Sequence, residues 1–161
     1  MKLSSILKQR APRDWLIGYD WQKGDRLLAE FSQMIGNREL RNGNRGGNGK
    51  SSDSRLVPPT ILLVADDPME FIAGFLASLL HHCPVFLANP NWREAEWQEV
   101  FNLVQPDLVF GKSPIQKYGE KYAIAQPNYG EIMIPTGGSS GKIRFVRHTW
   151  QTLTASVRGF C

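Results

Sequence analysis

The strongest indication of the fold is the stretch Ile61-Leu62-Leu63-Val64-Ala65-Asp66-Asp67-Pro68. Its first five residues are all apolar, which is typical of a strand buried on both faces of a sheet. The two aspartates can cap a helix, and Pro68 suits the first helical turn because its missing N–H would lack a partner there in any case. The stretch therefore predicts a buried strand that leads directly into a helix.

The residues that follow repeat this alternation of helix and strand. We predict a helix over residues 69–82, a strand over 84–88, a second helix over 93–104 and a third short strand over 107–110. Elements of these lengths in this order are typical of a parallel sheet with helices packed on it. We therefore expect an α/β fold with an open, mostly parallel sheet and flanking helices.

The run from residue 71 to residue 89 contains no Asp, Glu, Lys or Arg and could be mistaken for a membrane span. Its middle holds His81, His82, Cys83 and Pro84, so it is better explained as a buried helix followed by a buried strand. The His-His-Cys triplet does not predict a metal site, because adjacent side chains on a helix diverge and no partner cluster at ligand spacing accompanies them. We expect neither a membrane segment nor a metal-binding residue here.

The composition is that of an ordinary globular protein. The chain has 161 residues, 42% of them hydrophobic, and a formal net charge of +4. This mild positive charge fits a small anionic ligand, and the absence of a dense Lys/Arg run with interleaved aromatic residues argues against nucleic-acid binding. Two cysteines, Cys83 and Cys161, do not make a disulfide framework, and the first ten residues lack an apolar run of signal-peptide length. We therefore expect a cytoplasmic protein.

Residues 1–56 are expected to form a separate N-terminal segment. Residues 14–21 have the pattern of an extended segment, and Asp25 is a candidate cap for a helix that follows it. The apolar residues of that helix at helical spacing are Leu27, Leu28, Phe31 and Met34.

A surface loop predicted over residues 41–56 comes close to a Walker A pattern. Its first fourteen residues include no apolar side chain. Gly49-Lys50-Ser51 matches the end of the Walker pattern, but Asn44 stands where the first glycine is required. No apolar strand enters the loop, and Pro58-Pro59 follows in place of a helix start. We therefore do not assign phosphate binding to this loop.

A second glycine-rich segment follows a short apolar strand predicted over residues 131–135. It consists of Thr136-Gly137-Gly138-Ser139-Ser140-Gly141-Lys142. Glycines allow consecutive backbone N–H groups to point at one anion, the hydroxyl groups add donors, and Lys142 adds positive charge. These are the groups that a polyphosphate requires.

This second segment is not a Walker A loop either, because Thr136 replaces its first glycine and Ile143 replaces its final serine or threonine. Residues 143–147 are β-branched, aromatic and basic in rough alternation, which predicts a strand in place of the helix of a P-loop protein. The sequence thus predicts strand, Gly/Ser/Thr loop and strand. A plain hairpin turn is the alternative, although such a turn rarely needs six consecutive Gly, Ser or Thr residues.

Residues 136–146 resemble the signature loop of the adenylate-forming superfamily, which includes acyl-CoA synthetases, peptide-synthetase adenylation domains and luciferases. The usual pattern in that superfamily is Thr-Ser-Gly-Thr-Thr-Gly, any residue, Pro, Lys, Gly, Val. Among the departures of this chain, Gly137 replaces serine, Ile143 replaces proline and Arg144 replaces lysine. Arg144 keeps the positive charge and is therefore the candidate for the role of the lysine, although the two side chains are not interchangeable. The resemblance covers about residues 57–158.

The resemblance implies an ATP-dependent acid–CoA ligase. Such enzymes use ATP and Mg²⁺ to convert a carboxylate into an acyl-adenylate, from which the thiol of CoA displaces AMP. Residues 136–150 are most similar to the cyanobacterial-type o-succinylbenzoate–CoA ligases of phylloquinone and menaquinone synthesis. Thr136 to Lys142 would then contact the ATP phosphates, and the partners would be a small-molecule carboxylate, ATP and CoA.

Residues 57–161 are then expected to be part of the AMP-binding α/β domain. The adenine-binding motif, the ribose-binding acidic residue, the hinge and the catalytic lysine of the C-terminal lid all follow the loop in this family. We find no counterpart for them in the chain, so we expect a truncated ligase that is inactive alone. Two other interpretations stay open: a non-enzymatic nucleotide-binding module with the same loop, and an α/β interaction domain whose loop is only a turn.

Overall fold

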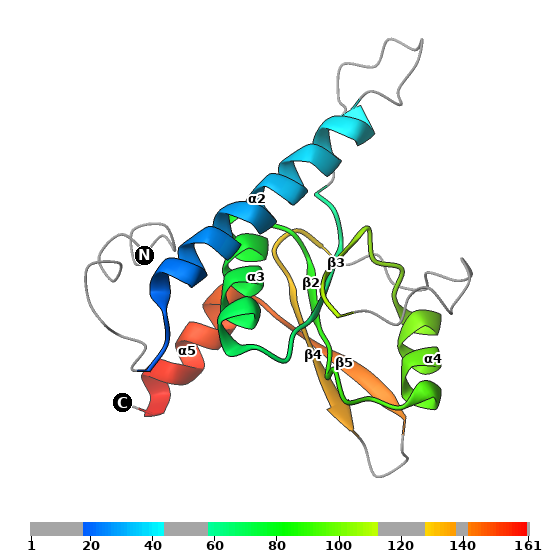
Figure 1. The fold of residues 1–161 in the computed structure, drawn as a ribbon. Helices are drawn as coiled ribbons and strands as arrows, with labels where there is room; N and C mark the ends of the chain where they lie inside the picture. Colours follow the sequence, from blue (N-terminus) through cyan, green and yellow to red (C-terminus); the bar gives the residue numbers. More distant parts are fainter. Residues whose placement is uncertain (1–17, 44–57, 113–127, 138–141, 161) are drawn as a thin grey trace.

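The computed structural model describes residues 18–43, 58–112, 128–137 and 142–160. Within these ranges the chain has an α/β fold, in which one mostly parallel mixed sheet is flanked by helices (Figure 1). The predicted fold class is confirmed. In chain order the described elements are α2 (Trp21–Gly43), β1 (Ile61–Val64), α3 (Pro68–Leu80), β2 (Val85–Leu87), α4 (Glu94–Leu103), β3 (Leu108–Gly111), β4 (Ile132–Gly137), β5 (Ile143–His148) and α5 (Trp150–Phe160).

The strand order of the sheet is β3-β1-β2-β4-β5. β1 pairs in parallel with β2 and with β3, and β2 pairs in parallel with β4. β5 runs antiparallel to β4, with Ile132 opposite His148 at one end and Gly137 opposite Ile143 at the other. The carboxyl ends of β1, β2, β3 and β4 therefore lie at one edge of the sheet, which we call the carboxyl edge.

β1 is the most buried strand of the sheet. All side chains of Ile61–Val64 are fully buried. Ile61 and Leu63 belong to the core on the side of α2 and α3, whereas Leu62 and Val64 belong to the core on the side of α4. Burial on both faces explains why this run shows no alternation of polar and apolar residues, and the prediction of a doubly buried strand is confirmed.

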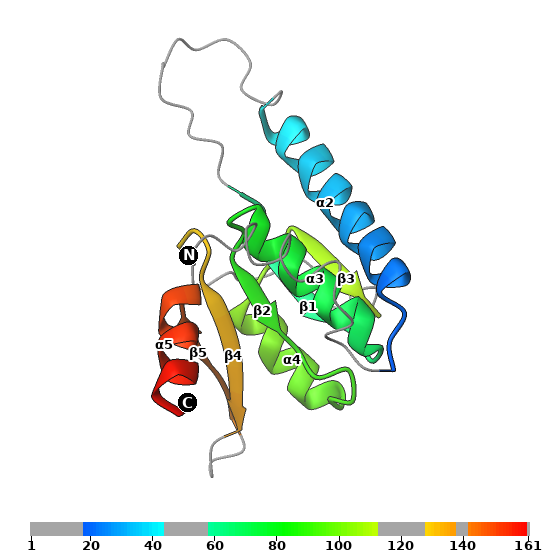
Figure 2. The ribbon, with the colours of Figure 1, turned by 90° about the vertical axis from the view of Figure 1, so that its left-hand side faces the viewer.

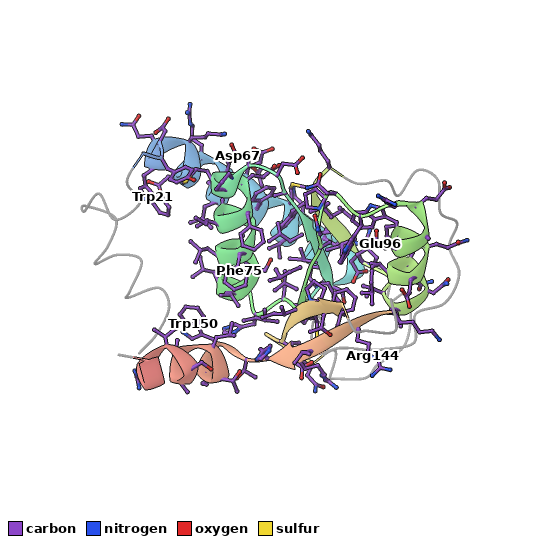
Figure 3. The ribbon with its side chains drawn as sticks, turned by 90° about the horizontal axis from the view of Figure 1, so that it is seen from below. Trp21, Asp67, Phe75, Glu96, Arg144 and Trp150 are labelled. Atoms are coloured by element: carbon purple, nitrogen blue, oxygen red, sulfur yellow. The ribbon has the colours of Figure 1, made fainter. Side chains whose placement is uncertain are left out.

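The two connecting helices cover opposite faces of the sheet (Figure 3). On the α4 face, Trp97 and Val100 of the helix are buried against Phe86 and Met133. On the other face α3 is joined by α5, whose Trp150 is partly buried against the same core. Helices on both faces are what the alternation of strand and helix predicted.

The uncharged run from residue 71 to residue 89 is a helix followed by a strand, as predicted. Asp67 caps α3, since its Oδ1 accepts a hydrogen bond from the Glu70 N–H at 2.9 Å, and Pro68 occupies the first turn. The helix ends at Leu80, and His82 takes a positive φ of 54° where the chain turns toward β2. In the part of the chain that the structure describes, no helix combines the length and the apolar character that crossing a membrane requires.

The start of the N-terminal helix differs from the prediction. α2 begins at Trp21 and is capped by Asp20, whose Oδ1 accepts from the N–H groups of Gln22 at 2.9 Å and Lys23 at 3.2 Å. The prediction of Asp25 as the cap is therefore wrong, and so is the assignment of Trp21 to an extended segment. Asp20 satisfies free N–H groups one turn earlier, so Asp25 lies inside the helix.

The far end of α2 also differs from the prediction. The helix continues to Gly43, so residues 41–43, which were predicted to belong to a loop, are helical. The sequence-based boundary failed because the Arg/Asn/Gly composition of residues 41–43 favours a loop, although backbone hydrogen bonding continues through them. The remainder of that loop, with its near-match to Walker A and the expected boundary at residue 57, lies outside the described residues.

α2 packs on α3, and its C-terminal end extends past the rest of the described fold (Figures 1 and 2). Near its start Lys23 Nζ lies 2.8 Å from Asp67 Oδ2, and this hydrogen bond is the main cause that lowers the pKa of Asp67. In its middle Phe31 stacks on Phe110 of β3, with ring centroids 4.3 Å apart. Further along, Arg38 Nη2 lies 3.5 Å from Asp107 Oδ1. The helix therefore spans the sheet from the carboxyl edge toward the opposite edge.

Candidate functional site

The predicted polyphosphate loop joins two antiparallel strands. β4 runs through Thr136 to Gly137, β5 begins at Ile143, and these two strands form the predicted strand–loop–strand arrangement. β5 is a strand and not a helix, so the predicted difference from a P-loop protein is confirmed. Because β4 is parallel to β2, its carboxyl end places the loop at the carboxyl edge of the sheet.

The structure describes three of the seven predicted loop residues. Thr136 and Gly137 end β4, and Lys142 directly precedes β5. All three are exposed. Gly138, Ser139, Ser140 and Gly141 lie outside the described residues. The described residues therefore fix the two stems of the loop.

Arg144, the candidate for the role of the family lysine, is paired with Thr136 across the hairpin. Ile143 and Phe145 pack toward α4, so alternation along the strand places Arg144 on the other face of the sheet. Its side chain is exposed and points away from the sheet (Figure 3). In the described residues neither Arg144 nor Lys142 has an acidic partner, so both charges are available to an anion.

The hydroxyl group of Thr136 is already engaged. Thr136 Oγ1 donates a hydrogen bond to the carbonyl oxygen of Arg144 at 3.3 Å. A phosphate could receive this proton only if the hydroxyl rotated away from the carbonyl. Lys142 is therefore better placed than the Thr136 hydroxyl to serve as a donor.

The end of the hairpin opposite the loop is held by an ion pair. Arg147 donates to the Glu131 carboxylate through Nε at 3.1 Å and through Nη2 at 2.6 and 2.8 Å. Asn128 donates to the same carboxylate through its backbone N–H at 2.8 Å and its side-chain amide at 3.2 Å. Burial, the largest single influence, raises the pKa of Glu131, but the hydrogen bonds from Arg147 and Asn128 together outweigh it and leave the pKa below its ordinary value.

The loop end of the hairpin is held by a contact that the sequence did not predict. Glu99 of α4 accepts a hydrogen bond through Oε2 from the backbone N–H of Ile143 at 2.9 Å. The two residues are 44 positions apart. No sequence signal marked Glu99, because a glutamate beside the apolar face of a helix is ordinarily a solvated surface residue. The contact places a carboxylate at the exit of the predicted phosphate loop.

Aromatic packing on the α4 face of the sheet holds the hairpin in place. The ring of Phe145 meets that of Phe86 edge to face, with centroids 5.0 Å apart. Ile143 is 7% exposed and belongs to the same core as Trp97 and Val100 of α4. Core packing of this kind holds the stems of the loop in place, as a binding site on a rigid scaffold requires.

The carboxyl edge has the topology of a ligand site. The chain leaves β1 toward α3 and leaves β2 toward α4, and these helices lie on opposite faces. In open α/β sheets ligands bind outside the carboxyl ends of strands at such a switch point. Two other lysines at this edge have acidic partners, since Lys112 Nζ lies 3.5 Å from Asp66 Oδ2 and Lys23 Nζ lies 2.8 Å from Asp67 Oδ2.

The histidine and cysteine triplet has a structural place at the end of α3. His81 is the C-cap residue, and its carbonyl oxygen lies 3.7 Å from the buried Cys83 Sγ. Across the described ranges, no three His, Cys, Asp or Glu side chains gather as a metal ion would need.

The chain was compared with known proteins. No protein-family model matches it, and no curated protein sequence matches it significantly.

Proposed function

We propose that the chain binds the phosphates of ATP at the hairpin loop between β4 and β5 and belongs to an ATP-dependent acid–CoA ligase of the adenylate-forming superfamily. The observation that supports this most is the position of the Gly/Ser/Thr loop. It joins two antiparallel strands at the carboxyl edge of a mostly parallel sheet, with exposed Lys142 and Arg144 at its exit. The substrate class is a small carboxylate, with o-succinylbenzoate as the specific candidate.

The residues at the loop have defined parts in this proposal. Backbone N–H groups of residues 137–142 would donate to the β- and γ-phosphate oxygens, and Lys142 would neutralise part of their charge. Arg144 would stabilise the negative charge that develops as the carboxylate attacks the α-phosphorus and pyrophosphate leaves. Gly137 fits this role, because a Cβ built on it meets no atom within 4 Å, so the backbone is open to a ligand.

In this proposal ATP would bind as its magnesium complex. Mg²⁺ would neutralise part of the negative charge that develops on the phosphates. The described residues of the hairpin offer cations and N–H donors, so they suit the phosphates themselves. CoA would enter only in the second half-reaction, and we assign it no residue of this chain.

The first test is the affinity of the purified chain for MgATP, measured by isothermal titration calorimetry. We expect Lys142→Ala to weaken binding by about ten-fold, since a hydrogen bond to a charged group contributes about 1.5–3 kcal/mol and part of it is lost to solvent at an exposed site. Lys112→Ala is the matched control, because this exposed lysine follows β3, at the far side of the strand order from β4. The absence of MgATP binding, or equal losses in both variants, would contradict the assignment.

A second test separates a ligase from a non-enzymatic nucleotide-binding module. Residues 131–148 of this chain replace the corresponding hairpin in an intact o-succinylbenzoate–CoA ligase, and carboxylate-dependent exchange of pyrophosphate into ATP is measured. We expect the chimera to catalyse exchange, Arg144→Lys to retain most of it and Arg144→Ala to slow it. A chimera that binds ATP without exchange would favour the non-enzymatic module. From the 161 residues alone we expect MgATP binding without exchange.

A further inference from the structure

β5 is the last strand on one side of the sheet. Its inner side pairs with β4, and among the described residues no strand pairs with its outer side. Figure 3 shows β5 beside β4 at the margin of the described ribbon. An outer strand of this kind carries backbone N–H and C=O groups that can pair with a further strand.

The pairing of β4 determines which groups of β5 are open. Along a strand, successive residues direct their N–H and C=O groups alternately toward one neighbour and the other. The Glu131 C=O accepts a hydrogen bond from the Val85 N–H of β2 at 2.9 Å, so every second residue from Ile132 onward directs its groups toward β5. The β5 residues that bond to β4 are therefore the partners of these residues, namely Arg144, Val146 and His148.

The other three residues of β5 direct their backbone groups away from the sheet. These residues are Ile143, Phe145 and Arg147. The hydrogen bond from the Ile143 N–H to Glu99 Oε2 agrees with this alternation, because that N–H is not used by β4. Glu99 thus closes the first donor of the outer edge. Within the described ranges, the backbone groups of Phe145 and Arg147 are left open to a further strand.

We propose that the outer edge of β5 pairs with the same edge of a second copy of this chain. The two strands run antiparallel about a two-fold axis, so the two sheets join into one. Val146 lies opposite the second copy's Val146, and Phe145 lies opposite the second copy's Arg147. The open groups of these two residues then form about four hydrogen bonds between the copies. Val146, which is 43% exposed in the single chain, is covered by its counterpart.

The charges and the hydrogen bond to Glu99 select this register. A two-fold axis at Phe145 would require the Ile143 N–H, which Glu99 already occupies. An axis at Arg147 would place two guanidinium groups opposite each other, which is unfavourable. With the axis at Val146, Arg147 keeps its ion pair with Glu131 and meets an aromatic ring. A second copy therefore supplies matching donors, acceptors and side chains from one short segment.

The dimer should be weak and reversible, because a pair of short strands buries less surface than a stable dimer needs. Sedimentation equilibrium of the purified chain, from micromolar to millimolar concentration, measures the association with and without MgATP. We expect a monomer–dimer equilibrium in both conditions, since the edge takes no part in the proposed nucleotide binding. Val146→Lys should weaken the dimer by about ten-fold or more, because it sets two like charges opposite each other and removes an apolar contact. Val157→Lys is the matched control on α5, where the valine is 62% exposed, and should leave the dimer unchanged.

Cross-linking tests the register itself. In a Cys161→Ser background, Val146→Cys should form a disulfide-linked dimer in oxidised glutathione, because residues opposite each other in a non-hydrogen-bonded pair have Cα atoms about 4.5 Å apart. Val157→Cys should cross-link much more slowly. If Val146→Lys fails to fold, the two cysteine variants decide the matter.

Several results would overturn the proposal. These are a monomer at every concentration, equal weakening by the two lysine variants, or equal cross-linking by the two cysteine variants. Slow amide exchange of Phe145 in the dilute monomer would also overturn it, because another part of the chain would then cover the edge. Association with a strand of a different protein, without self-association, would show that the occupant is not a second copy.

Discussion

The hairpin that carries the loop should lose a measurable part of its stability when Glu131 becomes Gln. The substitution keeps the size of the side chain but removes its charge and turns one accepting oxygen into a donor. The wild-type carboxylate accepts from Arg147 at 2.6, 2.8 and 3.1 Å and from the Asn128 N–H at 2.8 Å. An amide cannot accept all of these bonds, so at least one donor from Arg147 would face another donor.

The magnitude follows from the exposure of the two partners. The Glu131 side chain is 13% exposed, which makes each charged hydrogen bond worth about 1.5–3 kcal/mol. The Arg147 side chain is 54% exposed, so water replaces much of what it loses and the ion pair itself contributes about 1 kcal/mol or less. We therefore expect Glu131→Gln to lower the free energy of unfolding by about 1–2 kcal/mol and the melting temperature by about 2–8 °C.

The pH dependence of this loss has a definite sign. The pKa of Glu131 in the folded chain lies below its ordinary value, so the folded state favours the charged form. The stabilising contribution is therefore fully present above the unfolded pKa of about 4.3, and it is lost as the pH falls through the lower folded pKa. The difference between wild type and Glu131→Gln should be full at pH 7 and should shrink below about pH 4.3.

Urea unfolding at a series of pH values measures this difference, and a double-mutant cycle with Arg147→Met isolates the ion pair. In the Arg147→Met background Glu131→Gln should cost less than in the wild type. An equal cost in both backgrounds would show that the pair contributes nothing. A difference that stayed constant from pH 7 to pH 3 would refute the explanation through the charge of Glu131.

Two further predictions concern the core that supports the site. Gly111→Ala should lower the free energy of unfolding, measured in urea, by more than about 2 kcal/mol, because Gly111 has a φ of +91° and an added Cβ would lie 1.8 Å from the carbonyl oxygen of Val64. A variant as stable as the wild type would contradict this placement of β3 beside β1. Phe110→Ala should lower the free energy of unfolding by about 3–5 kcal/mol, because the ring is 1% exposed and stacks on Phe31 of α2. A loss below about 1 kcal/mol would mean that α2 is not packed on Phe110.

The elements that could be predicted from the sequence are those with a strong local signal. Ile61–Val64 is recognisable because burial on both faces requires an unbroken apolar run. α3 is recognisable because Asp67 and Pro68 mark its start, and residues 143–147 alternate as a strand should. In each case the physical cause lies within a few residues of the element itself.

The features that could not be predicted depend on residues that are distant in sequence. Glu99 and Ile143 meet only because α4 and the hairpin share a core, and neither residue type at its position indicates the other. The pairing of Arg147 with Glu131 depends in the same way on the register of β4 and β5. The prediction of the helix cap failed for a local reason, since Asp20 and Asp25 are the same residue type and the sequence does not show which of them precedes the first helical turn.

The proposed function requires that the hairpin loop binds the polyphosphate of ATP. Its most direct test is amide hydrogen exchange on the purified chain, with and without saturating MgATP, resolved to peptides by mass spectrometry. We predict slower exchange in the peptide that covers residues 136–142, little change in α2, and loss of this protection in Gly138→Val, whose side chain would crowd the approach of a phosphate to the backbone. Equal protection of the loop in both proteins, or MgATP binding with protection only elsewhere in the chain, would contradict the claim.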